Sequence, residues 1–225
     1  MQSDSVAAAV AEVRREIAAH ASRPGVTLCA VTKGFGVDAI RLARDAGCEA
    51  IGENYAQELQ SKMTELGDEP RPEVHFIGRI QSNKIRLVAP WVAVWQTVDR
   101  GDIIAEIARR APAGTRIMIQ VNAALESGKG GCRPEDVPAL LAAAADNGIV
   151  VDGLMTMGPT SQDPDDTRRT FRAVRRLADD HGLVGCSMGM SGDLRIALEE
   201  GSTLVRVGTR LFGERPVRPS PTGVL

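Results

Sequence analysis

Apolar and polar positions follow two distinct patterns along the chain. Between residues 6 and 21, valine and isoleucine recur at helical spacing, and Pro24-Gly25 ends that segment. Beyond it, short apolar runs alternate with longer amphipathic segments. Because the short runs show no clean alternation with polar residues, they are typical of parallel strands that are covered on both faces.

These patterns predict one leading helix followed by eight strand-then-helix units. The strands are expected at residues 27–32, 49–52, 74–78, 92–98, 116–121, 149–155, 184–188 and 204–207. The helices that follow them are expected at residues 37–46, 55–66, 82–88, 102–110, 134–146, 164–180 and 193–199, with a short helical turn near Leu211. At about 28 residues each, the units are close to the shortest that a strand–helix–strand repeat allows.

The fold that closes such units most economically is a single α/β domain, a (β/α)8 TIM-type barrel with an extra N-terminal helix. An open, doubly wound sheet is the alternative, and the spacing of the units does not decide between the two. No linker or shift in composition divides residues 1–215, so they are expected to form one domain. Residues 216–225 contain three prolines and little that could pack, so they are predicted to be a flexible tail.

The composition and the cysteine spacing argue against several classes of protein. The chain has 225 residues with 27 basic and 29 acidic side chains, and this balance argues against a strong nucleic-acid binder. No apolar run is long enough to span a membrane, no secretory signal is visible, and no long apolar helix face demands a partner, so a monomer is expected. The cysteines lack metal-binding or redox spacing, so a reducing cytoplasmic location without disulfides or bound metal is expected. They are Cys29, Cys48, Cys132 and Cys186.

The basic residues are unevenly divided, which draws attention to lysine. Of the 27, 23 are arginine and four are lysine. Lys33 directly follows the first strand, at the end where barrels of this kind place functional side chains. A partly desolvated amine there can form an imine with an aldehyde, although a surface lysine at the start of a loop is the alternative. Lys62 is expected on an exposed helix face, and Lys84 and Lys129 are weaker imine candidates.

Small and hydroxyl residues follow the last two predicted strands. Ser191 and Gly192 come after the seventh strand, and Gly208 and Thr209 come after the eighth. Backbone N–H groups in such loops can approach an anion, and loops seven and eight form the recurrent phosphate site of this barrel. A helix N-cap at Ser191 and a plain turn at Gly208 are the alternatives. Arg206 lies inside the last strand, where it is expected either to pair with a carboxylate or to donate to a ligand.

Ordered motifs along most of the chain resemble those of a known family. They are Ala30-Val31-Thr32-Lys33, Gly52 to Glu58, His75 to Gly78 with Gln81 to Lys84, Gln120-Val121-Asn122, Gly153 to Thr156, Ser187 to Ser191, and Gly201 to Gly213. In this order they resemble the pyridoxal phosphate homeostasis proteins, also called the proline synthetase co-transcribed homologue family. Two positions depart from the family pattern. Val74 replaces an aromatic residue, and Gly34-Phe35-Gly36 replaces a Thr-Lys-Pro-like run.

The resemblance implies a barrel like the N-terminal domain of alanine racemase that holds pyridoxal 5′-phosphate (PLP) covalently as an imine. Ser191, Gly208 and Thr209 match phosphate contacts. Arg206 matches the partner of the pyridine nitrogen, and Asn54 matches a residue that lines the same pocket. Because an arginine cannot accept a proton from that nitrogen, the ring stays unprotonated and is a poorer electron sink. The complete predicted cofactor site is Lys33 (the imine lysine), Asn54, Ser191, Gly192, Arg206, Gly208 and Thr209.

Three functions compete for such a site. The first is a PLP homeostasis protein that holds PLP on Lys33, serves PLP-dependent apo-enzymes and has no turnover or catalytic residues of its own. The second is a racemase-like enzyme, whose second acid/base in the resemblance is a tyrosine from a C-terminal β-domain. This chain ends at Leu225, and its one tyrosine, Tyr55, lies near the second strand. The third is a Schiff-base phosphosugar aldolase, which would want a second lysine or acid near the first. The first function is the one predicted here.

Overall fold

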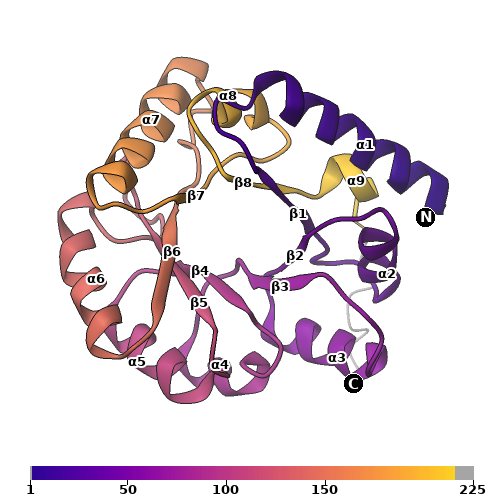
Figure 1. Ribbon diagram of the computed structural model, residues 1–225, viewed down its shortest axis with the longest axis horizontal. Coiled ribbons are helices and arrows are strands. Elements are labelled where there is room, and N and C mark those ends of the chain that lie inside the picture. The colour runs from indigo at the N-terminus through magenta and orange to yellow at the C-terminus, as the bar shows by residue number, and fades with distance from the viewer. Residues whose placement is uncertain (1, 216–225) are drawn as a thin grey trace, which may run out of the picture.

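Each short apolar run of the sequence forms a parallel strand. In the computed structural model, which describes residues 2–215, eight such strands close into one barrel surrounded by helices (Figure 1). The strands are β1 (Thr27–Val31), β2 (Ala50–Glu53), β3 (Glu73–Phe76), β4 (Val94–Val98), β5 (Arg116–Gln120), β6 (Val150–Met155), β7 (Gly185–Ser187) and β8 (Leu204–Val207). The predicted flexible tail, residues 216–225, lies outside the described residues.

The helices alternate with the strands, as the sequence pattern predicts. They are α1 (Ser3–His20), α2 (Asp38–Asp45), α3 (Ala56–Leu66), α4 (Ser82–Val88), α5 (Gly101–Arg110), α6 (Val137–Asp146), α7 (Pro164–Asp180), α8 (Leu194–Glu199) and α9 (Thr209–Phe212). The segment predicted as one helix from residue 134 begins with a separate 3₁₀ turn, η1 (Pro134–Asp136), before α6. Pro134 opens the 3₁₀ turn and Pro138 lies in the first turn of α6, and the start of a helix is the place where proline is tolerated.

The pairing of the last strand with the first decides between the two predicted architectures. β8 lies parallel to β1, with Thr27 opposite Leu204 and Ala30 opposite Val207. The sheet therefore has no edge at these strands, so the barrel is confirmed and the open doubly wound sheet is wrong. Closure also brings the C-terminal ends of β1 and β8 together, although they are far apart in the sequence.

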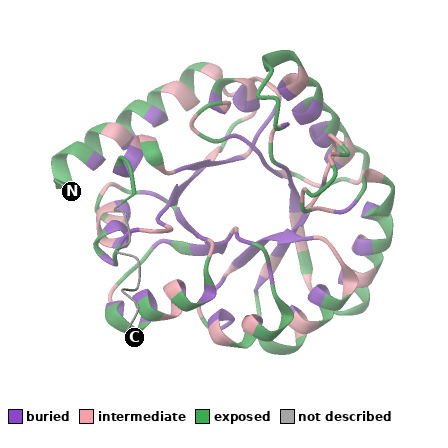
Figure 2. Ribbon diagram, turned by 180° about the vertical axis from the view of Figure 1, so that it is seen from behind, coloured by how far each residue is buried: buried purple, intermediate pink, exposed green. Residues whose placement is uncertain are grey.

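The main hydrophobic core lies between the barrel and the surrounding helices. Figure 2 shows buried residues along the strands and on the inner faces of the helices, with exposed residues facing outward. Alternate strand residues point to opposite sides, so Leu28 of β1 packs in this outer core while Cys29 packs with Ala50 and Leu204. The extra helix α1 runs along the outside of the barrel near α8 and α9 (Figure 1) and buries its valine stripe.

The four cysteines all lie in the interior of the protein. Cys29, Cys48, Cys132 and Cys186 are all buried free thiols. Burial raises the pKa of Cys48 to about 11 and that of Cys186 to about 12, so both stay protonated at neutral pH. Within residues 2–215, no helix is long and apolar enough to cross a membrane.

Two facing glycines allow β6 and β7 to approach closely. Gly153 is paired with Gly185, and a Cβ atom at Gly153 would lie 2.0 Å from the Gly185 carbonyl oxygen. We expect Gly153→Ala to lower the free energy of unfolding by about 1–3 kcal/mol or more, because the backbone must move to admit the methyl group. Urea-induced unfolding measures this change.

The control for that substitution is Gly101→Ala. A Cβ atom there would have one near neighbour, the Ala143 Cβ atom at 3.9 Å, which is an ordinary contact. This variant is expected to stay within about 0.5 kcal/mol of the wild type. Equal urea midpoints for the two variants would contradict the close approach of β6 and β7.

Candidate functional site

The C-terminal ends of β1, β7 and β8 enclose a cavity of about 230 Å³. Its lining residues are Val31, Lys33, Phe35, Ile77, Met190, Ser191, Gly192, Arg206, Gly208, Thr209 and Arg215. Six of the seven residues predicted for the site are in this lining, and Asn54 is not. The barrel thus gathers segments from both ends of the sequence into one place.

Lys33 occupies the corner of a tight turn that follows β1. The Phe35 N–H donates to the Thr32 carbonyl oxygen at 3.2 Å, and Gly34 has a φ of 80°, as in a type II turn. The turn presents the half-buried Lys33 side chain to the cavity. Within residues 2–215 its amine has no hydrogen-bond or ion-pair partner.

The surroundings of Lys33 favour the neutral amine. Burial lowers its pKa below the usual value, and the positive charges of Arg215 and Arg206 lower it further. A neutral amine is the nucleophilic form of lysine. Lys33 is therefore better suited to attack a carbonyl group than an ordinary surface lysine is.

Unused hydrogen-bond donors line the part of the cavity formed by the loops after β7 and β8. The backbone N–H groups of Ser191 and Gly192 donate to no acceptor within residues 2–215, and the same is true of Gly208 and Thr209. The hydroxyl groups of Ser191 and Thr209 are likewise without a partner in that range. Six free donors around one cavity are suited to bind a phosphate or another oxyanion.

Arg206 lies in β8 with its guanidinium at the base of the cavity. It is 4% exposed, and it donates to the Ser187 hydroxyl and, at 2.9 Å, to the Thr156 carbonyl oxygen. No carboxylate of the described residues forms an ion pair with it, so the contacts favour a donor to a ligand over a structural ion pair. Burial lowers the pKa of Arg206, but a guanidinium starts so high that it remains charged at neutral pH.

A chain of polar side chains crosses the barrel interior behind Arg206. The Ser187 hydroxyl donates to the Gln96 side-chain oxygen at 2.7 Å, and Gln96 Nε2 lies 2.6 Å from His75 Nδ1. His75 Nε2 in turn lies 2.9 Å from Glu73, at the opposite end of the barrel. Ser187, Gln96 and His75 are all buried. Because each member has a partner, the chain fixes the Ser187 hydroxyl that receives Arg206.

Asn54 lies in a neighbouring cavity. That cavity has a volume of about 340 Å³ and is also lined by Tyr55, Arg79 and Lys84. Asn54 Oδ1 is buried and has no hydrogen-bond partner within residues 2–215. The structure therefore places Asn54 in the lining of this second cavity and not in that of the Lys33 cavity.

Lys62 differs most from its expected place. The prediction of an exposed helix position is wrong, because Lys62 is 4% exposed. α3 turns this residue toward the end of β1, where its amine donates to Glu53 and Glu58. Charged residues on a helix usually lie on its solvent-exposed face. Lys62 is buried instead because the carboxylates of Glu53 and Glu58 neutralise its charge.

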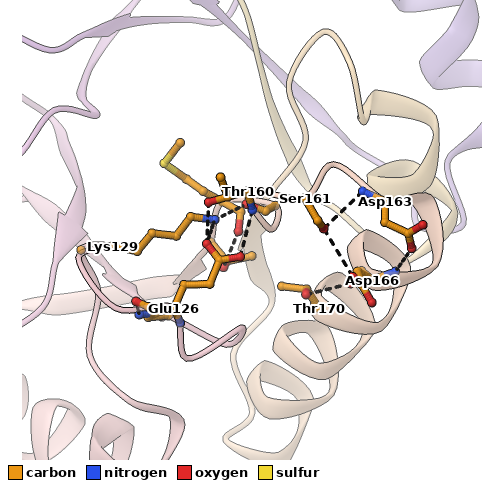
Figure 3. Close-up of polar contacts among 12 residues, drawn as sticks. Glu126, Lys129, Thr160, Ser161, Asp163, Asp166 and Thr170 are labelled. Carbon is orange, nitrogen blue, oxygen red and sulfur yellow. Dashed lines mark hydrogen bonds and ion pairs between the residues drawn. The ribbon is translucent and has the colours of Figure 1, made fainter.

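Lys129 connects the loops that follow β5 and β6 (Figure 3). Its amine donates to the Gly158 carbonyl oxygen at 2.7 Å and forms an ion pair with Glu126 at 2.8 Å. Glu126 also accepts hydrogen bonds from Thr160, at 2.6 Å from the hydroxyl and 2.9 Å from the N–H. Hydrogen bonds from Lys129 and Thr160 lower the pKa of Glu126 to about 2, so this carboxylate stays charged at neutral pH. Lys129 therefore has a structural contact, which agrees with its weaker ranking from the sequence.

Several lining residues were missed from the sequence. Phe35 and Ile77 lie just beyond the ends of β1 and β3, so the rule that site residues follow strand ends could have found them. The same rule does reach Met190, beside Ser191, although Met190 is not among the predicted site residues. Arg215 follows α9, and nothing in the sequence separates it from the other arginines.

The family of the alanine racemase N-terminal domain matches residues 7–216 of the chain. The closed barrel and the cavity over β1, β7 and β8 thus define a protein of the alanine racemase N-terminal barrel class. Curated proteins that are similar to this chain over most of its length identify a narrower family within that class. The pyridoxal phosphate homeostasis protein of Pseudomonas aeruginosa is 39% identical over 219 residues, which cover 94% of this chain and 95% of that protein. The one of Deinococcus radiodurans is 41% identical over 219 residues, covering 92% and 99%.

A solved structure gives the same result. PipY of Synechococcus elongatus PCC7942 with PLP bound has a TM-score of 0.80 and 31% sequence identity, and the match covers 92% of this chain and 100% of that one. The chain belongs to the pyridoxal phosphate homeostasis protein family. The resemblance found in its motifs is therefore confirmed.

Proposed function

We propose that the protein binds PLP in the Lys33 cavity, holds it as a covalent imine on Lys33, and supplies it to PLP-dependent apo-enzymes without turnover of its own. The observation that carries this proposal is the presence, in one cavity, of an amine without a partner and six donors without an acceptor. PLP has the two complementary groups, an aldehyde and a phosphate. The PLP-bound structure of PipY supports the choice of ligand.

The chemistry of the cavity fits each polar part of PLP. The Lys33 amine would condense with the aldehyde and release water. The four residues with free N–H groups would hold the phosphate, and they are Ser191, Gly192, Gly208 and Thr209. Arg206 would donate a hydrogen bond to the pyridine nitrogen, since it is a buried cation without a carboxylate partner in the described residues.

The same residues favour a carrier over an enzyme. Bound PLP supplies an electron-withdrawing ring, which is strongest when its nitrogen is protonated. Arg206 cannot accept a proton from that nitrogen, so it supports the weaker, unprotonated form. Among the described lining residues, the titratable side chains are Lys33 and two arginines, so Lys33 is the one available base. Racemisation by two bases needs a second group, and Tyr55 lies in the neighbouring cavity.

The aldolase alternative lacks an acid at the same place. The carboxylates nearest to the turn of Lys33 are Glu53 and Glu58, which contact Thr32 and Gly34. Neither carboxylate lines the cavity. An aldolase would need such a group in contact with its substrate, so the carrier role remains the better supported function.

The location and assembly state belong to the same proposal. A reducing cytoplasmic environment fits four buried free thiols. We also propose that the protein works as a monomer, because all the donors of the site come from one chain.

Absorbance spectroscopy with borohydride trapping tests the proposal. Mixed with PLP, the purified protein is expected to turn yellow, and borohydride is expected to fix PLP on one peptide, the one containing Lys33. A label on Lys84 or Lys129 would refute the site, and the absence of an imine band would refute imine-linked PLP. Alanine racemisation is expected to be negligible. Turnover at ordinary enzyme rates, about 1–10³ s⁻¹, would contradict the carrier role.

A further inference from the structure

A buried ion cluster of Glu53, Glu58 and Lys62 lies behind the turn that carries Lys33. The Lys62 amine donates to Glu53 Oε1 at 2.6 Å and to Glu58 Oε1 at 2.8 Å. Its third hydrogen bond goes to the Thr32 carbonyl oxygen at 2.9 Å. An ammonium group has three N–H donors, so these contacts use all of them. The three side chains are at most 9% exposed.

The cluster contacts both peptide neighbours of Lys33. On one side, the Thr32 hydroxyl donates to Glu53 Oε1 at 2.6 Å, in addition to the contact between Lys62 and the Thr32 carbonyl. On the other side, the Gly34 N–H donates to Glu58 Oε1 at 2.5 Å. The turn is therefore held on each side of the residue whose side chain enters the cavity. Its own internal bond, from the Phe35 N–H, is the longer contact at 3.2 Å.

Stability alone gives a weak reason for such a cluster. Burying charged groups costs so much desolvation energy that a buried ion pair adds little net stability, although it can impose one geometry. Burial raises the pKa of Glu53, and the charge of Lys62 opposes that rise. Burying this cluster costs desolvation energy, and the cluster contacts Thr32 and Gly34. Its role is therefore better explained by its positioning of the turn that carries Lys33.

The cluster also acts on Lys33 through its charge. Burial, Arg215 and Arg206 lower the pKa of the Lys33 amine, whereas Glu53 and Glu58 raise it. The two carboxylates therefore limit the effect of the nearby cations. They do so from outside the cavity, because neither is a lining residue.

We propose that Glu53, Glu58 and Lys62 are positioning residues that hold the Thr32–Gly34 turn so that the Lys33 amine stays directed at the PLP aldehyde. This inference rests on the proposed function, because it assigns the cluster a role in imine formation. It does not assign the cluster any contact with PLP.

Two variants break the cluster in different ways. Glu58→Ala removes the acceptor of the Gly34 N–H and places a strong helix former in α3, so it is expected to fold. Lys62→Met removes the charge that joins both carboxylates and the donor to Thr32. The matched control is Arg175→Met, which removes another buried cation, 5% exposed, that binds Asp179 on α7.

Three measurements separate positioning from general damage. Amide hydrogen exchange at Gly34 in the PLP-free protein is expected to accelerate by about tenfold or more in Glu58→Ala, which removes the charged acceptor of that N–H. In Lys62→Met the acceptor remains but loses the ammonium group that holds it, so a smaller acceleration is expected. Affinity for PLP is expected to fall by a similar factor. Affinity for pyridoxine 5′-phosphate, which lacks the aldehyde, is expected to stay at the wild-type value. The control is expected to lose stability and keep all three values.

The pH profile of Lys33 acylation gives a further readout. Removing the Glu58 carboxylate takes away a negative charge that favours the ammonium form, so the pKa of Lys33 falls. The midpoint of acylation is expected to move to lower pH in Glu58→Ala and to stay unchanged in Arg175→Met. An unchanged midpoint in Glu58→Ala would remove the electrostatic part of the inference.

Two results would overturn the positioning role. One is unchanged exchange at Gly34 in both variants, and the other is an equal loss of affinity for PLP and pyridoxine 5′-phosphate. If Lys62→Met fails to fold, Glu58→Ala carries the test. A wild-type protein that forms no imine would instead refute the proposed function. Amide exchange at Gly34 is measured without PLP, so it tests the contacts between the cluster and the turn independently of that function.

Discussion

Lys33→Ala is expected to remove the imine absorbance band completely while leaving the fold intact. No other lysine lines the cavity, so no second amine is available to the PLP aldehyde there. Within residues 2–215 the Lys33 amine has no partner that its loss would leave unsatisfied. The free energy of unfolding should therefore stay within about 0.5 kcal/mol of the wild type. Absorbance titration with PLP measures the first effect, and urea unfolding of the PLP-free protein measures the second.

Two controls sharpen this prediction. Lys33→Arg keeps a positive charge but cannot form the imine, so it should also lose the band. Lys84→Ala removes an amine from the neighbouring cavity and should keep the band. Retention of the band in Lys33→Ala would move the imine to another lysine and refute the assignment of this cavity.

The fold could be predicted from the sequence because local and long-range signals agree. The short apolar runs set the strands, and proline and glycine set many of the boundaries between elements. Closure could not be deduced from spacing, since an open sheet uses the same units. It depends on the pairing of Thr27 to Ala30 with Leu204 to Val207, a contact between the two ends of the chain.

The residues of the site also fall into those that could be predicted from the sequence and those that could not. Lys33, Ser191 and Thr209 could be found because a barrel places the ends of its strands around one mouth. Asn54 also follows a strand, yet it lies in the neighbouring cavity. The rule predicts at which end of the barrel a residue lies, but it does not predict which way its side chain points. Lys62 was misplaced for a different reason. Its position on a helix suggested solvent, and only the tertiary structure shows the carboxylates that accept its charge.

Arg206→Gln is the second substitution with a large expected effect. It removes the cation proposed to face the pyridine nitrogen and leaves the Ser187 hydroxyl and the Thr156 carbonyl without their donor. We expect PLP affinity to fall by at least about tenfold, since hydrogen bonds to charged groups contribute roughly 1.5–3 kcal/mol. We also expect a loss of about 1–3 kcal/mol in the free energy of unfolding, because buried polar groups lose a partner.

The two effects of Arg206→Gln can be separated by changing the ligand and the residue behind it. A 1-deaza analogue of PLP lacks the ring nitrogen, so the substitution should weaken PLP binding much more than binding of the analogue. Ser187→Ala keeps the guanidinium but removes its buried partner and interrupts the chain through Gln96, so it should show a smaller loss of PLP affinity. Equal weakening of both ligands by Arg206→Gln would mean that Arg206 supports the barrel mouth without contacting the ring nitrogen. Selective weakening of PLP binding would place the guanidinium at that nitrogen, where it would keep the ring unprotonated, as the proposed carrier role requires.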